Sequence, residues 1–292
     1  MNTQLAGILP ALVTPLLPDG GVNIAALEKL LERVYTAGVD GVYLCGSTGE
    51  GTLLEAAERR KIVEAAVRNS PRGKQVVVHV GAWSLDVAEC LARHAESVQA
   101  AAVSSIRPAG VNYADMLAWY RTLGSASSLP LLAYYFPDST GERLSVDQLT
   151  EICQLPGVAG LKYTDYDLYT LSLLVRAGYP VFNGRDEVLA AGLLMGACGG
   201  IGSIYNLVPE LFVEVRNLSA AGDWKASRAL QDRINNLIRV LLRFPFLPSL
   251  KQVLTWEGID CGSVVRPRAR LTPSQQSELR TSLAELQMFR SL

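Results

Sequence analysis

Two patterns of apolar and polar positions take turns along this chain. A short β-branched or apolar run is followed by a Gly- or Pro-containing break, and then by ten or more residues with helical periodicity. The repeat predicts eight strands, each followed by a helical stretch. The predicted strands cover residues 8–14, 41–45, 75–81, 101–106, 129–136, 158–164, 180–184 and 199–204.

The spacing of these strands favours an α/β barrel. Consecutive strands begin mostly 20 to 35 residues apart, which is the length of one strand-helix unit. Because right-handed crossovers make each strand parallel to the last, we expect a closed (β/α)8 TIM barrel. A doubly wound open sheet is the alternative, but it more usually has about five to seven strands and often a G-x-G-x-x-G turn after the first. This chain has Thr14-Pro15 there.

Strand signals stop near residue 220, and the remainder has the pattern of helices over 224–244, 247–256 and 274–289. We therefore expect a barrel with the active site over 1–220 and a C-terminal helical bundle over 221–292. Leu279, Leu283 and Leu286 recur at helical spacing, which predicts a packing face against the barrel or a second subunit.

The composition excludes several classes of protein. The chain has 292 residues, with 27 basic and 28 acidic side chains and no charge block, so we expect neither nucleic acid nor an anionic membrane as partner. No run approaches about 18 apolar residues, so no membrane span is predicted. The apolar stretch 5–17 contains two prolines and precedes the first basic residue, Lys29, so no export signal is predicted.

Cysteine and histidine usage points to a reducing compartment and away from metal chemistry. The five cysteines are odd in number, widely spread and without a C-x-x-C pair, which disfavours a disulfide framework and favours the cytoplasm. His79 and His94 are the only histidines, so zinc and redox metals lack ligands. A carboxylate-bound magnesium ion is left open by this reasoning.

Barrel enzymes place their chemistry at the carboxyl ends of strands and in the loops that follow. Gly-Ser-Thr-Gly-Glu at 46–50 follows the second strand, and its hydroxyls and backbone N–H groups suit a carboxylate or a phosphate. The alternative is a turn in which Ser47 or Thr48 caps the next helix.

Lys162 ends the sixth predicted strand, on the same face as Val158, Gly160 and Thr164. If this face points into the barrel, burial lowers the lysine pKa and favours a neutral amine that attacks carbonyls. Lysine is scarce, with six against 21 arginines, and only Lys162 stands in a strand signal. The alternative is a side chain that reaches outward into solvent.

Two further positions carry candidate chemistry. Tyr134 ends the fifth strand, and a phenol near an amine can carry protons, although an aromatic in an apolar strand is more often a core residue. Gly-Arg-Asp-Glu at 184–187 and Gly-Ser at 202–203 follow the last two strands. These groups could bind a polyol chain, or Asp186 could cap the following helix.

Four motifs in order and spacing carry a resemblance to a known family. They are G-S-T-G-E at 46–50, Y-x-x-P at 134–137, L-K-x-T at 161–164 and G-G-I-G-S at 199–203. The chain resembles the N-acetylneuraminate lyase and dihydrodipicolinate synthase family of pyruvate-dependent class I aldolases, from Gly7 to beyond Lys251. The resemblance implies a (β/α)8 barrel with C-terminal helices and no metal or organic cofactor. It also implies a homo-oligomer, a tetramer or a dimer.

The resemblance assigns a role to each matching residue. Lys162 matches the Schiff-base lysine, Tyr134 the proton-relay phenol, and Ser47 with Thr48 the pyruvate-carboxylate cradle. The remaining substrate-binding positions resemble those with which the sialic acid lyase branch holds sugar hydroxyls. They are Thr164, Gly184, Asp186, Glu187, Ile201 and Ser203.

The chain also departs from the family. The synthase branch carries an arginine just after the Y-x-x-P proline, where this chain has Asp138-Ser139, which disfavours lysine biosynthesis. The aromatic pair usual after the fourth strand is absent from 107–111, and Tyr163, Asp165 and Tyr166 surround the lysine motif. We therefore expect a reshaped pocket that takes a different hydroxylated aldehyde or 2-oxo acid.

These observations predict an aldolase that cleaves or forms a carbon–carbon bond between pyruvate and a hydroxylated aldehyde, similar to N-acetylneuraminate lyase. The nearest alternatives are a dihydrodipicolinate synthase-like enzyme and a 2-keto-3-deoxy sugar acid aldolase or dehydratase. A non-catalytic 2-oxo acid sensor is a rival from another class, motivated by the missing aromatic pair. A third interpretation places the function on the surface of the helical appendage.

Overall fold

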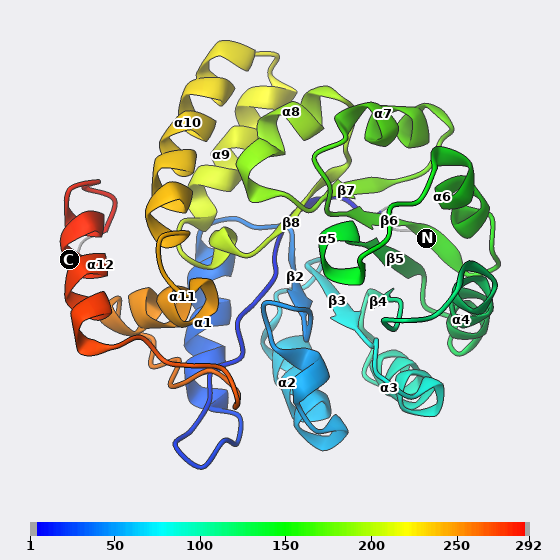
Figure 1. Ribbon diagram of the computed structural model, residues 1–292, viewed down its shortest axis with the longest axis horizontal. Coiled ribbons are helices and arrows are strands. Elements are labelled where there is room, and N and C mark those ends of the chain that lie inside the picture. Colours follow the sequence, from blue (N-terminus) through cyan, green and yellow to red (C-terminus); the bar gives the residue numbers. More distant parts are fainter. Residues whose placement is uncertain (1–4, 290–292) are drawn as a thin grey trace.

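The computed structural model describes residues 5–289, in which eight parallel strands alternate with helices (Figure 1). The strands are β1 Gly7–Pro10, β2 Gly41–Leu44, β3 Gln75–His79, β4 Ala102–Ile106, β5 Leu131–Tyr135, β6 Val158–Tyr163, β7 Val181–Asn183 and β8 Gly199–Gly202. Their order in the sheet is β1-β8-β7-β6-β5-β4-β3-β2, and a parallel bridge between Ala11 and Tyr43 joins the two ends. The predicted TIM barrel is confirmed.

Most strands are shorter than predicted because the chain leaves the ladder before the apolar run ends. The first predicted strand, 8–14, becomes β1 at Gly7–Pro10. Ala11 N and Leu12 N still donate to strands β8 and β2, whereas Val13 N donates to the Asn206 side chain. The sixth loses only Thr164, whose backbone N–H still donates to Tyr135 O at 2.8 Å. The residues left out at the ends of β1, β2, β3, β6 and β8 therefore belong to the loops at the carboxyl end of the barrel.

The outer helices surround the barrel, and several of them begin at a residue whose side chain caps them. They are α1 Ile24–Thr36, α2 Ala56–Asn69, α3 Leu85–Ser97, α4 Tyr113–Ser125, α6 Val146–Cys153, α7 Leu168–Arg176, α8 Leu189–Leu194 and α9 Pro209–Ala220, with short turns η1 Gly51–Leu53, α5 Pro137–Thr140, η2 Asp186–Val188 and η3 Ile204–Asn206. Asn23 accepts from Ala26 N at the start of α1, and Ser145 with Gln148 forms a capping box on α6.

The barrel separates two apolar cores. Leu9, Val77, Leu132, Phe182 and Ile201 point inward and fill the interior of the barrel. A larger cluster packs the outer face of the strands against the helices. Because successive strand residues point to opposite faces, most strands contribute to both layers. The filled interior leaves room for a site only above it, at the carboxyl ends of the strands.

Three helices follow the barrel: α10 Trp224–Leu241, α11 Phe246–Trp256 and α12 Pro273–Ala284. The α12 helix starts at a Thr272–Gln275 capping box and ends before the predicted residue 289. Leu279 and Leu283 are fully buried, and α12 contacts α10 and α11 (Figure 1). The stripe is a packing face, but it packs on these helices, whereas the barrel or a second subunit was the predicted partner. The division at residues 220 and 221 falls in the turn between α9 and α10 and stays a prediction.

No helix in the part of the chain that the structure describes combines the length and the apolar character needed to cross a membrane.

Candidate active site

One cavity of about 460 Å³ lies at the carboxyl ends of the strands, and all ten predicted site residues line it. They come from the loops after β2, β7 and β8 and from the ends of β5, β6 and β8: Ser47, Thr48, Tyr134, Lys162, Thr164, Gly184, Asp186, Glu187, Ile201 and Ser203. Positions far apart in the sequence therefore meet in one place, as the barrel topology requires.

Lys162 points into the barrel and is 4% exposed. It is the register partner of Tyr134 on the neighbouring strand. Its Nζ lies 4.2 Å from the centre of the Tyr134 ring and 4.1 Å from that of Tyr43. Burial lowers the pKa of Lys162 to about 7, against the opposing effect of the Asp186 charge. The side chain therefore does not reach outward, and much of it is a neutral amine at neutral pH.

Tyr134 is also buried, and burial raises the pKa of its phenol. The hydroxyls of Ser47 and Thr164 offset part of this increase. Thr164 Oγ1 is buried without a hydrogen bond of good geometry. A Cβ atom at Gly184 would lie 2.0 Å from that oxygen, so only glycine fits there. The phenol and the Thr164 hydroxyl thus face the same space as the Lys162 amine.

The loop after β2 does not cap a helix. Ser47 is exposed, and Thr48 Oγ1 lies 2.6 Å from Ser203 Oγ in the loop after β8. Glu50, and not Ser47 or Thr48, precedes η1, and its side chain makes no cap hydrogen bond. The two hydroxyls are therefore available at the cavity wall, as a carboxylate cradle needs.

Glu50 holds this loop in place. Its backbone has a φ of 55°, and its buried carboxylate lies 2.8 Å from Lys251 Nζ of α11. Glu50 Oε1 accepts from Arg268 Nη1 and from Val265 N, each at 2.9 Å. The sequence reasoning did not find this set, because Lys251 looks like any polar position on a helix. The C-terminal region thus supports the candidate cradle.

Asp186 does not cap its own helix. Its Oδ2 accepts from Ile204 N at 2.8 Å, while its buried Oδ1 has no hydrogen-bond partner among residues 5–289. Burial raises the pKa of Asp186 to about 7. A Cβ at Gly202 would lie 1.7 Å from Oδ1, so the glycine makes room for the carboxylate. Beside it, Glu187 accepts from Tyr166 OH at 2.9 Å.

The cavity has a wall that the sequence reasoning missed. The additional lining residues are Phe136, Arg185, Ile204, Ile238, Leu242, Phe246, Leu247 and Arg268. Four of them belong to α10, to α11 or to the turn between these helices. Arg185 lies in the Gly-Arg-Asp-Glu motif at 184–187, which the sequence analysis selected for its other three residues. The sequence therefore did indicate that Arg185 lies near the site. The wall contributed by the helices had no such signal.

His79 and Arg107 lie next to the site without entering it. His79 accepts from Ile106 N at 3.1 Å and contacts the Tyr134 ring edge-on, and burial holds its pKa well below the usual value. Arg107 occupies the loop that lacks the aromatic pair. It is buried and donates to Glu142 Oε2 at 2.8 Å. The loop after β4 is therefore fastened by a guanidinium group to the segment after β5.

Within residues 5–289 no three His, Cys, Asp or Glu side chains converge in the way that metal ligands do.

Comparison with known proteins adds a family and several relatives. The model of the dihydrodipicolinate synthetase family matches residues 4–286. The N-acetylneuraminate lyase of Rhizobium meliloti is 32% identical over 98% of this chain and 97% of its own length. That of Citrobacter koseri is 33% identical over 96% and 95%. The native structure of the Aliivibrio salmonicida lyase superposes with a TM-score of 0.91 at 27% identity, and covers 99% of both chains.

Proposed function

Because this chain belongs to the dihydrodipicolinate synthetase family and is a pyruvate-dependent class I aldolase, we propose that its reaction runs through a Schiff base on Lys162. The observation that carries this assignment is the buried amine beside the Tyr134 phenol, with a pKa lowered to about 7. A neutral amine at neutral pH is the form that attacks a ketone.

The bond changes follow from this nucleophile. Lys162 Nζ adds to C2 of a 4-hydroxy-2-oxo acid, and the carbinolamine loses water to give an iminium. Removal of the proton from the 4-hydroxyl breaks the C3–C4 bond, so the aldehyde leaves and the electron pair forms an enamine. Protonation at C3 and hydrolysis of the iminium then release pyruvate and restore the amine. The reverse sequence is aldol addition.

Tyr134 is the proton carrier in this proposal. Its ring contacts Lys162, and its phenol lies near Ser47 and Thr164, so one group can serve both the carbinolamine and the departing alkoxide. Ser47 and Thr48 hold the carboxylate of the 2-oxo acid through hydroxyl and backbone donors. Glu50 positions them through the buried contacts of its carboxylate.

The remaining lining residues suit a hydroxylated chain. Thr164 Oγ1 and Asp186 Oδ1 are buried polar atoms without good hydrogen bonds in the described chain, and substrate hydroxyls would satisfy them. Glu187 and Ser203 add an acceptor and a second hydroxyl, and Gly184 and Ile201 shape the space. We place the leaving aldehyde against this set.

The pocket differs from that expected of a sialic acid lyase. Phe136 and Arg185 line it, and the loop at 107–111 lacks the aromatic pair that the family usually has. We therefore propose a different hydroxylated aldehyde or 2-oxo acid as the partner of pyruvate. Asp138 pairs with Arg143 and Arg185, so the position where the synthase branch has an arginine carries the opposite charge.

We also propose a homo-oligomer, a tetramer or a dimer, that acts in the cytoplasm without metal or organic cofactor. The family resemblance supports the assembly and the absence of a cofactor. The five cysteines, Cys45, Cys90, Cys153, Cys198 and Cys261, are free thiols, which supports a reducing compartment.

A product assay tests the function. A panel of 4-hydroxy-2-oxo acids is incubated with the protein, and pyruvate is measured with lactate dehydrogenase and NADH. An aldolase releases pyruvate and an aldehyde in equal amounts, whereas a dehydratase loses water and releases no pyruvate. Absence of any turnover across the panel, with a 2-oxo acid still bound, would favour the sensor. Normal turnover by Lys162→Ala and Tyr134→Phe variants would instead place the function elsewhere.

A further inference from the structure

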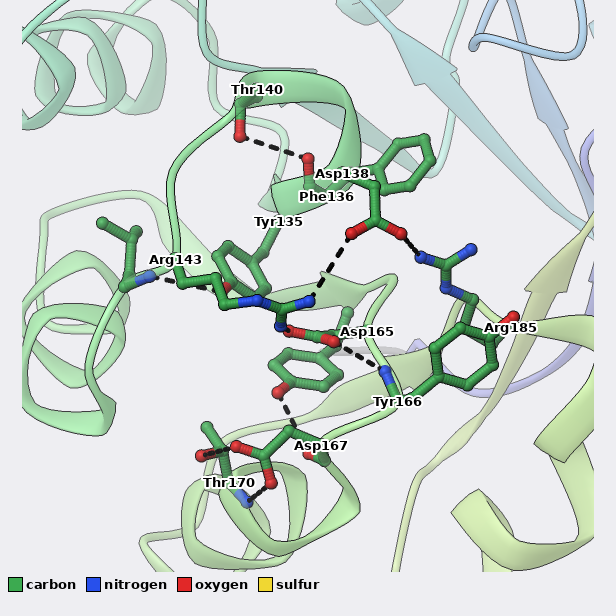
Figure 2. Close-up of polar contacts among 12 residues, drawn as sticks. Tyr135, Phe136, Asp138, Thr140, Arg143, Asp165, Tyr166, Asp167, Thr170 and Arg185 are labelled. Carbon is green, nitrogen blue, oxygen red and sulfur yellow. Dashed lines mark hydrogen bonds and ion pairs between the residues drawn. The ribbon is translucent and has the colours of Figure 1, made fainter.

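Arg185 is a fixed cation on the wall of the cavity, directly before Asp186. Its guanidinium carbon lies 4.4 Å from the centre of the Tyr166 ring and 5.2 Å from that of Phe136. Figure 2 shows the guanidinium between the loops that follow β5 and β6. Aromatic contacts of this kind orient the planar group and reduce the entropy that it loses on binding a ligand.

An ion pair fixes the same guanidinium from outside the cavity. Arg185 Nη2 donates to Asp138, which Arg143 also approaches at 3.5 Å (Figure 2). Asp138 does not line the cavity, whereas Arg185 does. Arg185 Nε is buried and has no hydrogen-bond partner among residues 5–289. The protein therefore orients this cation and leaves part of its donor capacity unused.

The second arginine that lines the cavity, Arg268, has a carboxylate partner near the candidate cradle. Arg268 also lines the wall, but its Nη1 donates to Glu50 beside the candidate cradle. Glu187 is a carboxylate in the same cavity, and it accepts from Tyr166, whose ring contacts Arg185. Arg185 is thus the cation on the side of the cavity formed by the loops after β5, β6 and β7, with the donors that a planar anionic group needs.

We propose that Arg185 binds an anionic group, a carboxylate or a phosphate, at the end of the substrate opposite its 2-oxo acid. This inference rests on the proposed function and narrows its substrate class to hydroxylated 2-oxo acids with a second acidic end. Arg185 is a specificity residue in this account and takes no part in proton transfer. The loop motif at 184–187 then holds hydroxyls through Asp186 and the terminal anion through Arg185.

Matched pairs of 2-oxo acids test the proposal without requiring cleavage. Diacids of five to seven carbons, 2-oxoglutarate, 2-oxoadipate and 2-oxopimelate, are compared with the monoacids of equal length. The concentration that half-saturates trapping of each on Lys162 by cyanoborohydride is measured. We expect at least one diacid to be preferred about tenfold over its monoacid, the size of one charge-assisted contact.

Three variants assign the preference to the side chain. Arg185→Gln is expected to abolish it, Arg185→Lys to retain part of it, and Arg228→Gln, on an exposed arginine of α10, to leave it unchanged. Unaltered half-saturation by pyruvate confirms that each variant is folded. A purely structural role of Arg185 would weaken trapping of diacids and monoacids equally, which would overturn the proposal.

A second set of probes distinguishes the two anions. Aldol addition of pyruvate to glyceraldehyde, glyceraldehyde 3-phosphate and tartronate semialdehyde compares a neutral, a phosphate and a carboxylate end on three-carbon aldehydes. A higher kcat/KM for either charged aldehyde, lost in Arg185→Gln, supports the proposal and names the anion. If neither the 2-oxo acid pairs nor the aldehydes show a preference for the second charged end, the proposed role of Arg185 is refuted. If pyruvate itself is not trapped on Lys162, the proposed function fails first.

Discussion

Glu50 and Lys251 form an ion pair of 2.8 Å in which both side chains are buried, 201 positions apart in the chain. The pair joins the loop with Ser47 and Thr48 to the helix α11 that follows the barrel. The pair therefore connects the candidate carboxylate-binding loop to the C-terminal region, which the sequence predicted to be a helical bundle.

Removing one member of this ion pair should lower the free energy of unfolding of the protein. Lys251→Met leaves the Glu50 carboxylate buried with Arg268 and Val265 N alone, so we expect a loss of about 3 kcal/mol in the free energy of unfolding. The exposed Lys61→Met control breaks only a surface pair and should change stability by less than about 0.5 kcal/mol. Urea denaturation measures both, and equal losses would show that the buried pair has no special role.

Asp186 should set the pH at which the lysine reacts. The rate of Schiff-base formation should rise with pH through about 7 as Lys162 loses its proton, and then level off. The Asp186 charge raises the pKa of Lys162, so Asp186→Asn should shift this rise to lower pH. Stopped-flow formation of the Schiff base at several pH values measures the shift. A rise that moves upward or stays in place would contradict the assigned interaction.

Burial of the charged form of Lys162 should also lower the stability of the folded protein. Because burial lowers its folded pKa from 10.5 to about 7, the cost is fully present below pH 7 and disappears as pH rises to 10.5. Lys162→Met should therefore stabilise the protein at pH 6 by about 1–3 kcal/mol, with a smaller gain at pH 9. Unfolding curves at both pH values test this. A gain independent of pH would mean that Lys162 is uncharged, or charged, across the whole range.

Loss of the phenol should separate binding from turnover. Tyr134→Phe keeps the ring against Lys162 but removes the proton carrier, so we expect kcat to fall about 100- to 10,000-fold. Pyruvate should still bind in the cavity and form an adduct slowly. Steady-state kinetics together with the mass of the trapped protein distinguish these effects. Full activity in this variant would transfer the proton relay to another group.

Much of the fold follows from residue patterns. The eight strands, their parallel order and the strand face that Lys162 shares with Gly160 and Thr164 come from alternation and spacing, which are local properties of the sequence. Only the folded barrel shows that this face points inward. The predicted end of the last helix, residue 289, lies five positions beyond the observed end of α12 at Ala284. The prediction was too long because the apolar Leu286 continues the stripe while packing outside the helix. Leu286 therefore gives the pattern of a helix without belonging to one.

The site was less accessible to sequence reasoning. Residues that end strands were found, since a barrel brings strand ends together whatever the loops do. Contacts between segments far apart in the sequence were not found. The Glu50–Lys251 and Arg185–Asp138 pairs and the cavity wall at Phe246 depend on packing that no spacing encodes. Tertiary contacts of this kind require the folded chain.

The central claim is that one buried amine forms the covalent intermediate. Incubation with pyruvate and cyanoborohydride, followed by proteolysis and peptide mass mapping, locates the adduct directly. The account predicts a single modified peptide with the adduct on Lys162, and no adduct in Lys162→Ala. A reduced adduct on any of the other five lysines, or none at all, would contradict it.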